Sequence, residues 1–162
     1  MAELTNLETK LGEVIGLAMA AQAATERVEK LTKDAKLRKQ LKTMRLEAAK
    51  AEKDGTAVAG SFNGKKSKIL AEARTVKTKG ATMMKTYLER GSDDLDGFEF
   101  LTMAEAGEVG HWGVLQELNK QARHPGVGEL VKVQLPIQKR HLKDVMAASL
   151  QLAATEDANA AA

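Results

Sequence analysis

In two stretches of this sequence a histidine follows a glutamate or a glutamine by three residues, which is about one helical turn. Glu108 and His111 form a Glu-x-x-His pattern, and Gln138 and His141 repeat the spacing with an amide in place of the carboxylate. Residues three apart share one face of a helix, and helical metal sites take ligand pairs with this spacing. Glu105 adds a second acidic side chain one turn before Glu108. The chemistry that these residue types favour is metal binding.

The acidic residues interrupt an apolar stripe, where a charge is costly. Glu108 falls between Leu101 and Leu115 in either phase of the stripe, while Glu105 and His111 fall in it under one phase each. A buried carboxylate must be paired, protonated or bound to a metal ion. We therefore expect these side chains to meet a partner inside the protein.

Folding the chain about a turn near Pro125 brings the two stretches to the same height. Glu108 then lies level with the neighbour of His141, and His111 lies level with the neighbour of Gln138. The alternative to a metal site is an ordinary polar layer. In that layer Glu105 and Glu108 would pair with Lys139, Arg140 or the histidines and fix the register of the helices.

Five helices are expected to position these groups. Apolar residues recur at intervals of three and four, which indicates amphipathic helices, over residues 2–33, 35–53, 65–90, 93–123 and 127–154. Residues 54–64 contain three glycines and are predicted to be the main loop. The short connections predict two antiparallel hairpins. The sequence thus predicts one all-α domain over residues 1–154, a four-helix bundle with an additional connecting helix, and a frayed tail at 155–162.

Composition excludes several classes of protein. With no cysteine there is no disulfide, thiolate metal site or cysteine nucleophile. With 3% aromatic residues, the core must come from leucine, valine, alanine and methionine. No apolar stretch is long enough to span a membrane, and no secretory signal is visible, so we expect a cytoplasmic protein without a membrane partner.

Positive charge is concentrated in the middle of the chain. Residues 27–90 contain 18 basic and 7 acidic residues, although the whole chain carries only +3. Such asymmetry is compatible with nucleic-acid binding, for which the candidates are Lys36, Arg38, Lys39, Lys42, Lys65, Lys66 and Lys68. The alternative is a solvated helix surface, because no zinc-finger spacing or RNA-binding aromatic pattern accompanies the charge.

The segments FLTMAEAGEVGHWGVLQELN and LPIQKRHLKDV resemble bacterial ferritin-like proteins related to rubrerythrin. The resemblance implies an up-down-down-up four-helix bundle that holds two iron or manganese ions and performs ferroxidase, peroxidase or oxidase chemistry. It implies that Glu105 or Glu108 is the carboxylate of the third bundle helix and His141 the histidine of the fourth. Gln138 stands where that helix has a bridging glutamate, and Glu47 is the best match in the second helix.

The predicted metal site therefore comprises Glu47, Glu105, Glu108, His111, Gln138 and His141. This set has too few carboxylates for a symmetric di-iron centre, whereas its ligand types suit a single iron, manganese or zinc ion. We expect a metal-binding ferritin-like protein with a role in oxidative stress; if it is an enzyme, it is a di-iron-type oxidoreductase. The alternative is a bundle that has lost the site and acts through its surface as a stress or partner-binding protein. Self-association stays open.

Overall fold

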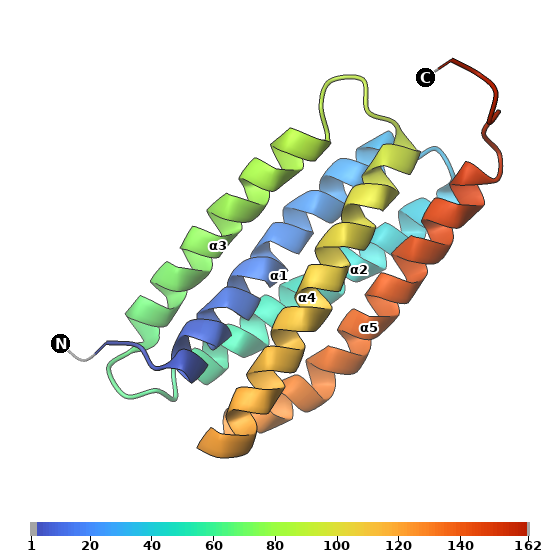
Figure 1. Cartoon of the computed structure of the whole chain (residues 1–162). Helices are drawn as coiled ribbons and strands as arrows, with labels where there is room; N and C mark the ends of the chain where they lie inside the picture. The colour runs from blue at the N-terminus through green and yellow to red at the C-terminus, as the bar shows by residue number, and fades with distance from the viewer. Residues whose placement is uncertain (1–2, 162) are drawn as a thin grey trace.

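The computed structural model describes residues 3–161, and over this range the protein consists of helices without strands (Figure 1). The five helices are α1 (Asn6–Leu31), α2 (Ala35–Ala59), α3 (Lys66–Tyr87), α4 (Asp94–Ala122) and α5 (Pro125–Ala153). The all-α prediction with five long helices is confirmed. No helix in the described range combines the length and apolarity needed to cross a membrane.

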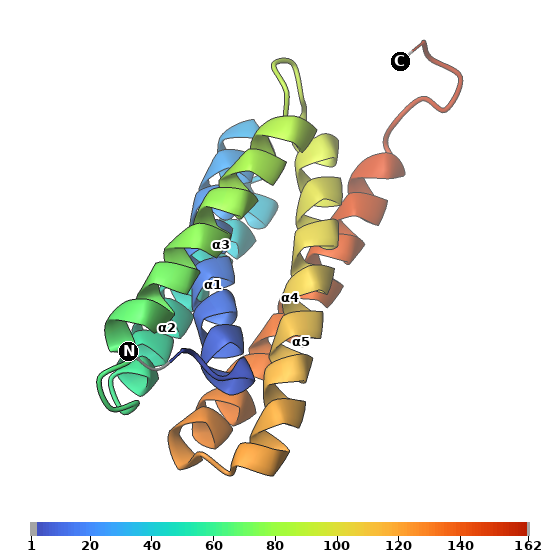
Figure 2. The ribbon, with the colours of Figure 1, turned by 60° about the vertical axis from the view of Figure 1, so that its left-hand side comes forward.

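Four of the helices form a ring in which each packs against two neighbours. α1 packs against α2 and α4, and α5 packs against the same two helices from the opposite corner (Figures 1 and 2). The hairpins are α1–α2 and α4–α5, and the two helices of each run antiparallel. In chain order, α1, α2, α4 and α5 run up, down, down and up. α3 lies outside this ring on α1 and carries the chain from the end of α2 back to the start of α4.

Glycines let α3 approach α1 very closely. A Cβ atom at Gly12 would lie 2.7 Å from the carbonyl oxygen of Ile69, and one at Gly16 would lie 2.3 Å from that of Ala73. Real Cβ atoms do not approach other heavy atoms so closely. One turn further along α1, Ala20 faces Gly80 in the same way, with 2.7 Å between the two Cβ positions. The small residues Gly12, Gly16 and Ala20, spaced four apart on α1, therefore allow α3 to pack closely against α1.

Polar side chains cap the first turns of several helices. Thr5 and Glu8 form a capping box at the start of α1, and Asp93 and Asp96 form another at the start of α4. At the start of α5, the ring nitrogen Nδ1 of His124 accepts a hydrogen bond from the backbone of Val127.

The structure corrects the predicted loop at 54–64. α2 continues through Asp54 and Gly55 to Ala59. A Cβ at Gly55 would lie 2.7 Å from Cγ1 of Ile15 on α1, so this glycine permits close helix packing and does not break the helix. The spacing of the apolar residues in 65–90 also predicts that Met83 and Tyr87 face inward, and this prediction is wrong. These side chains are 46% and 55% exposed, because α3 packs mainly on α1 and only slightly on α2 and α4.

Candidate functional site

A layer of polar side chains crosses the interior between two apolar clusters. The layer consists of Glu47 on α2, Glu105 and Glu108 on α4, and Gln138 and His141 on α5, and we call it the polar layer. Glu105 is 1% exposed, and Glu108 and His141 are each 4% exposed. The prediction that these groups turn inward and meet across α4 and α5 agrees with the structure. The apolar clusters on either side explain why they are shielded from water.

Glu105 connects α4 to α5. Its Oε2 atom accepts a hydrogen bond from the side-chain amide of Gln138 and lies 3.7 Å from Nδ1 of His141. Gln138 therefore serves as a donor to the carboxylate. A glutamate at this position would instead place a second negative charge beside Glu105.

Glu47 brings α2 into the polar layer from the opposite side of the imidazole. Its Oε1 atom lies 3.5 Å from Nε2 of His141, and its other oxygen accepts from the guanidinium of Arg140. Among residues 3–161, Glu47 Oε1 and His141 Nε2 are buried without any hydrogen-bond partner. Two atoms of kinds that commonly ligate metal ions thus lie 3.5 Å apart in the interior.

Glu108 is the least satisfied member of the polar layer. Its carboxyl group forms no hydrogen bond or ion pair with any described residue, and its strongest electrostatic neighbour is Glu105. Burial raises the pKa of Glu108 well above its usual value, and the nearby charge of Glu105 raises it further. In the folded protein this carboxyl group therefore favours its neutral form.

His111 was predicted to join this cluster, but the structure turns it toward α1. Its side chain is 42% exposed, and Nδ1 lies 3.2 Å from Oε2 of Glu13. The ammonium of Lys10 lies 3.2 Å from the same ring nitrogen. His111 faces α1 because it follows Glu108 by three residues and lies at the edge of the buried stripe.

Two buried acidic residues outside the polar layer were not expected from the sequence. Glu8 receives a hydrogen bond from Lys65 at 2.9 Å, and Glu29 pairs with Arg45 at 2.9 Å. Burial acts to raise the pKa of Glu8, but hydrogen bonds from Lys65 and the backbone and hydroxyl of Thr5 outweigh it, so the pKa is lowered. The capping spacing of Thr5 and Glu8 was the available signal.

The basic residues proposed for nucleic-acid binding fall into two groups. Lys36, Arg38, Lys39 and Lys42 lie in the first turns of α2, whereas Lys65, Lys66 and Lys68 lie at the start of α3. These helix starts are at opposite ends of the molecule (Figure 1). The seven residues therefore do not form one continuous surface.

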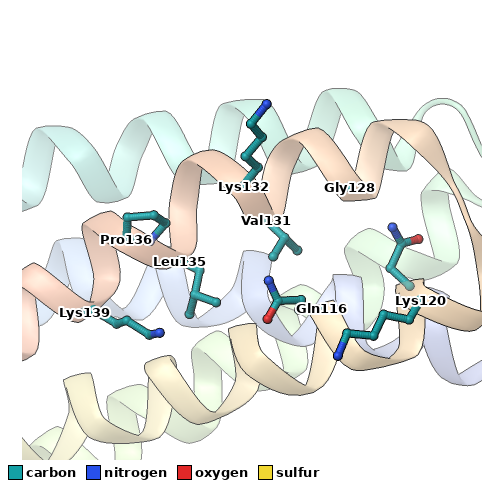
Figure 3. A pocket seen from close by; sticks show the side chains of 9 residues that line it. Gln116, Lys120, Gly128, Val131, Lys132, Leu135, Pro136 and Lys139 are labelled. Atoms are coloured by element: carbon teal, nitrogen blue, oxygen red, sulfur yellow. The ribbon is translucent and has the colours of Figure 1, made fainter.

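A surface groove of about 730 Å³ lies between α4 and α5. Val131 and Leu135 point from α5 toward α4, with Gln116 and Lys120 of α4 opposite them (Figure 3). Lys120, Lys132 and Lys139 are exposed. This groove is thus open to solvent and is separate from the polar layer.

A smaller cavity reaches the polar layer from the other side. It has a volume of about 190 Å³ and lies between α3 and α4, with alanines of α1 as its floor. Glu105 and Glu108 line it, and Phe100, Met83 and Met103 form much of the remaining wall. The polar layer therefore has an opening on the side of α3.

Comparison of the chain with protein-family models, with curated proteins and with solved structures finds no match in any of the three. Within the described range, no three histidine or acidic side chains are already arranged as the ligands of one metal ion. The donor set nonetheless contains carboxylate and imidazole groups, which iron, manganese and zinc accept. The gap between Glu47 and His141 is the part of the polar layer that best fits such an ion.

Proposed function

We propose that this protein is a ferritin-like bundle that binds one divalent metal ion in its polar layer through Glu47, His141 and Glu105. The observation that carries the proposal is the 3.5 Å separation of Glu47 Oε1 and His141 Nε2, both buried and unbonded. Two ligands of one tetrahedral zinc ion, each about 2.1 Å from it, are separated by about 3.4 Å. An ion between these atoms would satisfy both of them.

Glu105 would complete the ligand set by a local rotation. Its carboxylate now accepts from Gln138 and lies on the Nδ1 side of His141. Turning toward Glu47 would exchange the amide hydrogen bond for a bond to the ion, with water filling any further position. Because an imidazole offers a metal one ring nitrogen, His141 would use Nε2 and leave Nδ1 to a carboxylate or amide.

The helix order supports the ferritin-like assignment. Two antiparallel hairpins in the order up, down, down, up, joined by the long crossover α3, agree with the arrangement that the resemblance implies. The second, third and fourth bundle helices supply Glu47, Glu105 and His141, as that resemblance requires. A bound iron or manganese ion would supply redox chemistry with dioxygen or peroxide, and thus a role in oxidative stress.

The polar layer fits one ion better than two. Gln138 replaces a carboxylate, Arg140 already pairs with the single charge of Glu47, and α1 offers Ala21 near Glu105. Three residues after Glu47, where the Glu-x-x-His spacing would place a histidine, Lys50 points outward and pairs with Asp54. A di-metal centre would need about four carboxylates to balance its charge, and the polar layer has three.

Metal content tests the proposal directly. The chain is purified after expression in medium supplemented with iron and manganese, analysed by mass spectrometry for metals, and titrated with Zn²⁺, Mn²⁺ and Fe²⁺. We expect about one ion per chain and at least a tenfold loss of affinity in His141→Ala and in Glu47→Gln. His111→Ala is the matched control and should bind as the wild type does. A chain that is isolated without metal and takes up none on titration contradicts the proposal.

One observation favours the alternative, a surface-acting bundle without a metal. Lys36, Arg38 and Lys39 are exposed in the first turns of α2, where cations oppose the helix dipole, and no ion pair joins them to another described residue. Binding of DNA or RNA there should weaken steeply with salt. A gel-shift assay at low salt that shows no retention excludes it.

A further inference from the structure

The small cavity between α3 and α4 has the features of a ligand site. Ala20, Ala21 and Ala24 of α1 form its floor, and Gly80 and Met83 of α3 and Met103 of α4 line its sides. Its volume of about 190 Å³ exceeds the 150 Å³ of an engineered cavity that binds benzene. A single ring or short alkyl chain with one polar group therefore fits.

The polar atoms of this cavity belong almost entirely to acids. Glu105 and Glu108 line it, together with His111, whose Nδ1 faces Glu13 and Lys10 of α1. None of the described residues in its lining is lysine or arginine. Glu108 is only 4% exposed, and its carboxyl group forms no hydrogen bond or ion pair with any described residue. Buried polar groups are nearly always hydrogen-bonded, so a ligand that donates a hydrogen bond to this carboxyl group would be favoured in the cavity.

We propose that this cavity binds a small primary ammonium compound with an apolar body, and that Glu108 is the group that receives the ammonium. A charged amine would form charge-assisted hydrogen bonds with Glu108 and gain attraction from Glu105. Its apolar body would cover Phe100, Met83 and Met103, which now contribute apolar surface to the cavity.

Other occupants fit these walls less well. A divalent ion could use Glu105, Glu108 and His111, the titratable groups among the described lining residues, but it would leave the apolar walls without a partner. A neutral compound would gain the apolar contacts but neither a charge-assisted hydrogen bond with Glu108 nor the attraction of Glu105. An anion would be repelled by Glu105. The ammonium is the one class that uses both the charge and the apolar walls.

Calorimetric titration with benzylamine, with benzyl alcohol as the neutral analogue of the same size, tests the proposal. We expect saturable one-to-one binding of benzylamine and at least tenfold weaker binding of the alcohol. Glu108→Gln, which keeps the shape and removes an unpaired acid, should weaken benzylamine at least tenfold. Equal affinity for the two compounds, or no loss in Glu108→Gln, overturns the proposal, as does the absence of benzylamine binding.

Two glycines of α4 give a matched pair of variants. Gly107 lines the cavity and Gly110 does not, yet a Cβ at either position would have no heavy atom within 4 Å. Gly107→Leu should block benzylamine, whereas Gly110→Leu should bind it normally. Blockage by both variants or by neither contradicts the assignment of the site. Glu47→Gln separates the two proposals when it is compared with the wild type in metal-free buffer. Glu47 does not line the cavity, so this variant should lose metal affinity and bind benzylamine as the wild type does.

Discussion

Adding one methyl group at Gly16 should loosen α3 from the bundle. In Gly16→Ala the new Cβ would lie 2.3 Å from the carbonyl oxygen of Ala73 and 2.7 Å from Cβ of Val76. The oxygen belongs to the backbone of α3 and cannot rotate away. The contact therefore resolves only if α3 moves outward, and this movement separates the surfaces that Gly12, Gly16 and Ala20 bring together.

The size of the effect follows from two opposing contributions. Overpacking of a well-packed interface costs about 1–3 kcal/mol. Replacing glycine by alanine within a helix returns about 0.5–1 kcal/mol through the unfolded state and helix propensity. We therefore expect Gly16→Ala to lower the free energy of unfolding by about 1–2 kcal/mol, which lowers the Tm of a chain of this size by roughly 2–8 °C.

The matched control is Gly107→Ala on α4. A Cβ there would meet no heavy atom within 4 Å, so only the favourable contribution applies. This variant should be more stable than the wild type by about 0.5–1 kcal/mol. Urea unfolding followed by circular dichroism measures both variants, and hydrogen exchange should show lost protection first in α3. If Gly16→Ala is as stable as Gly107→Ala, the close approach of α3 to α1 is refuted.

Three further substitutions test the buried polar groups and the core. Glu108→Gln should be more stable than the wild type at neutral pH. The raised pKa of Glu108 means that its stabilising contribution is present in acid and is lost as the pH rises through the folded value, so the difference should shrink toward pH 4. Glu8 has a lowered pKa, so Glu8→Gln should cost about 1–3 kcal/mol at pH 7, and this cost should disappear as the pH falls through the folded value. Trp112 is 1% exposed, and Trp112→Ala should lower the free energy of unfolding by about 3–5 kcal/mol. Urea titrations across pH measure all three.

The helices and the meeting of α4 with α5 could be predicted because their signals are local. The buried apolar residues of α1 recur at intervals of three and four from Leu7 to Val28, and this spacing, visible in the sequence, determines one face of the helix. A tight turn at Pro125 then fixes which residues of α4 and α5 are level. Glu105 accordingly meets Gln138 and His141.

The position of α3 could not be predicted from its own periodicity. Its apolar residues span more of its surface than α1 covers, so Met83 and Tyr87 remain exposed. The reason for its close packing lies in Gly12 and Gly16, far away in the sequence. The wrong prediction of a loop at Gly55 has a similar cause. This glycine makes room for Ile15 of another helix, but in the sequence it cannot be distinguished from a glycine that ends a helix.

The charge of the polar layer argues for a single ion, because its groups already balance one another in part. Arg140 pairs with one oxygen of Glu47 and leaves the other facing His141, while Gln138 neutralises no charge but orients Glu105. Glu108 favours its neutral form because it is buried and because Glu105 lies beside it. A first divalent ion would be balanced by Glu105 and by the charge of Glu47, which it would share with Arg140. A second would have to ionise Glu108 and find further carboxylates that neither α1 nor α5 provides at this height.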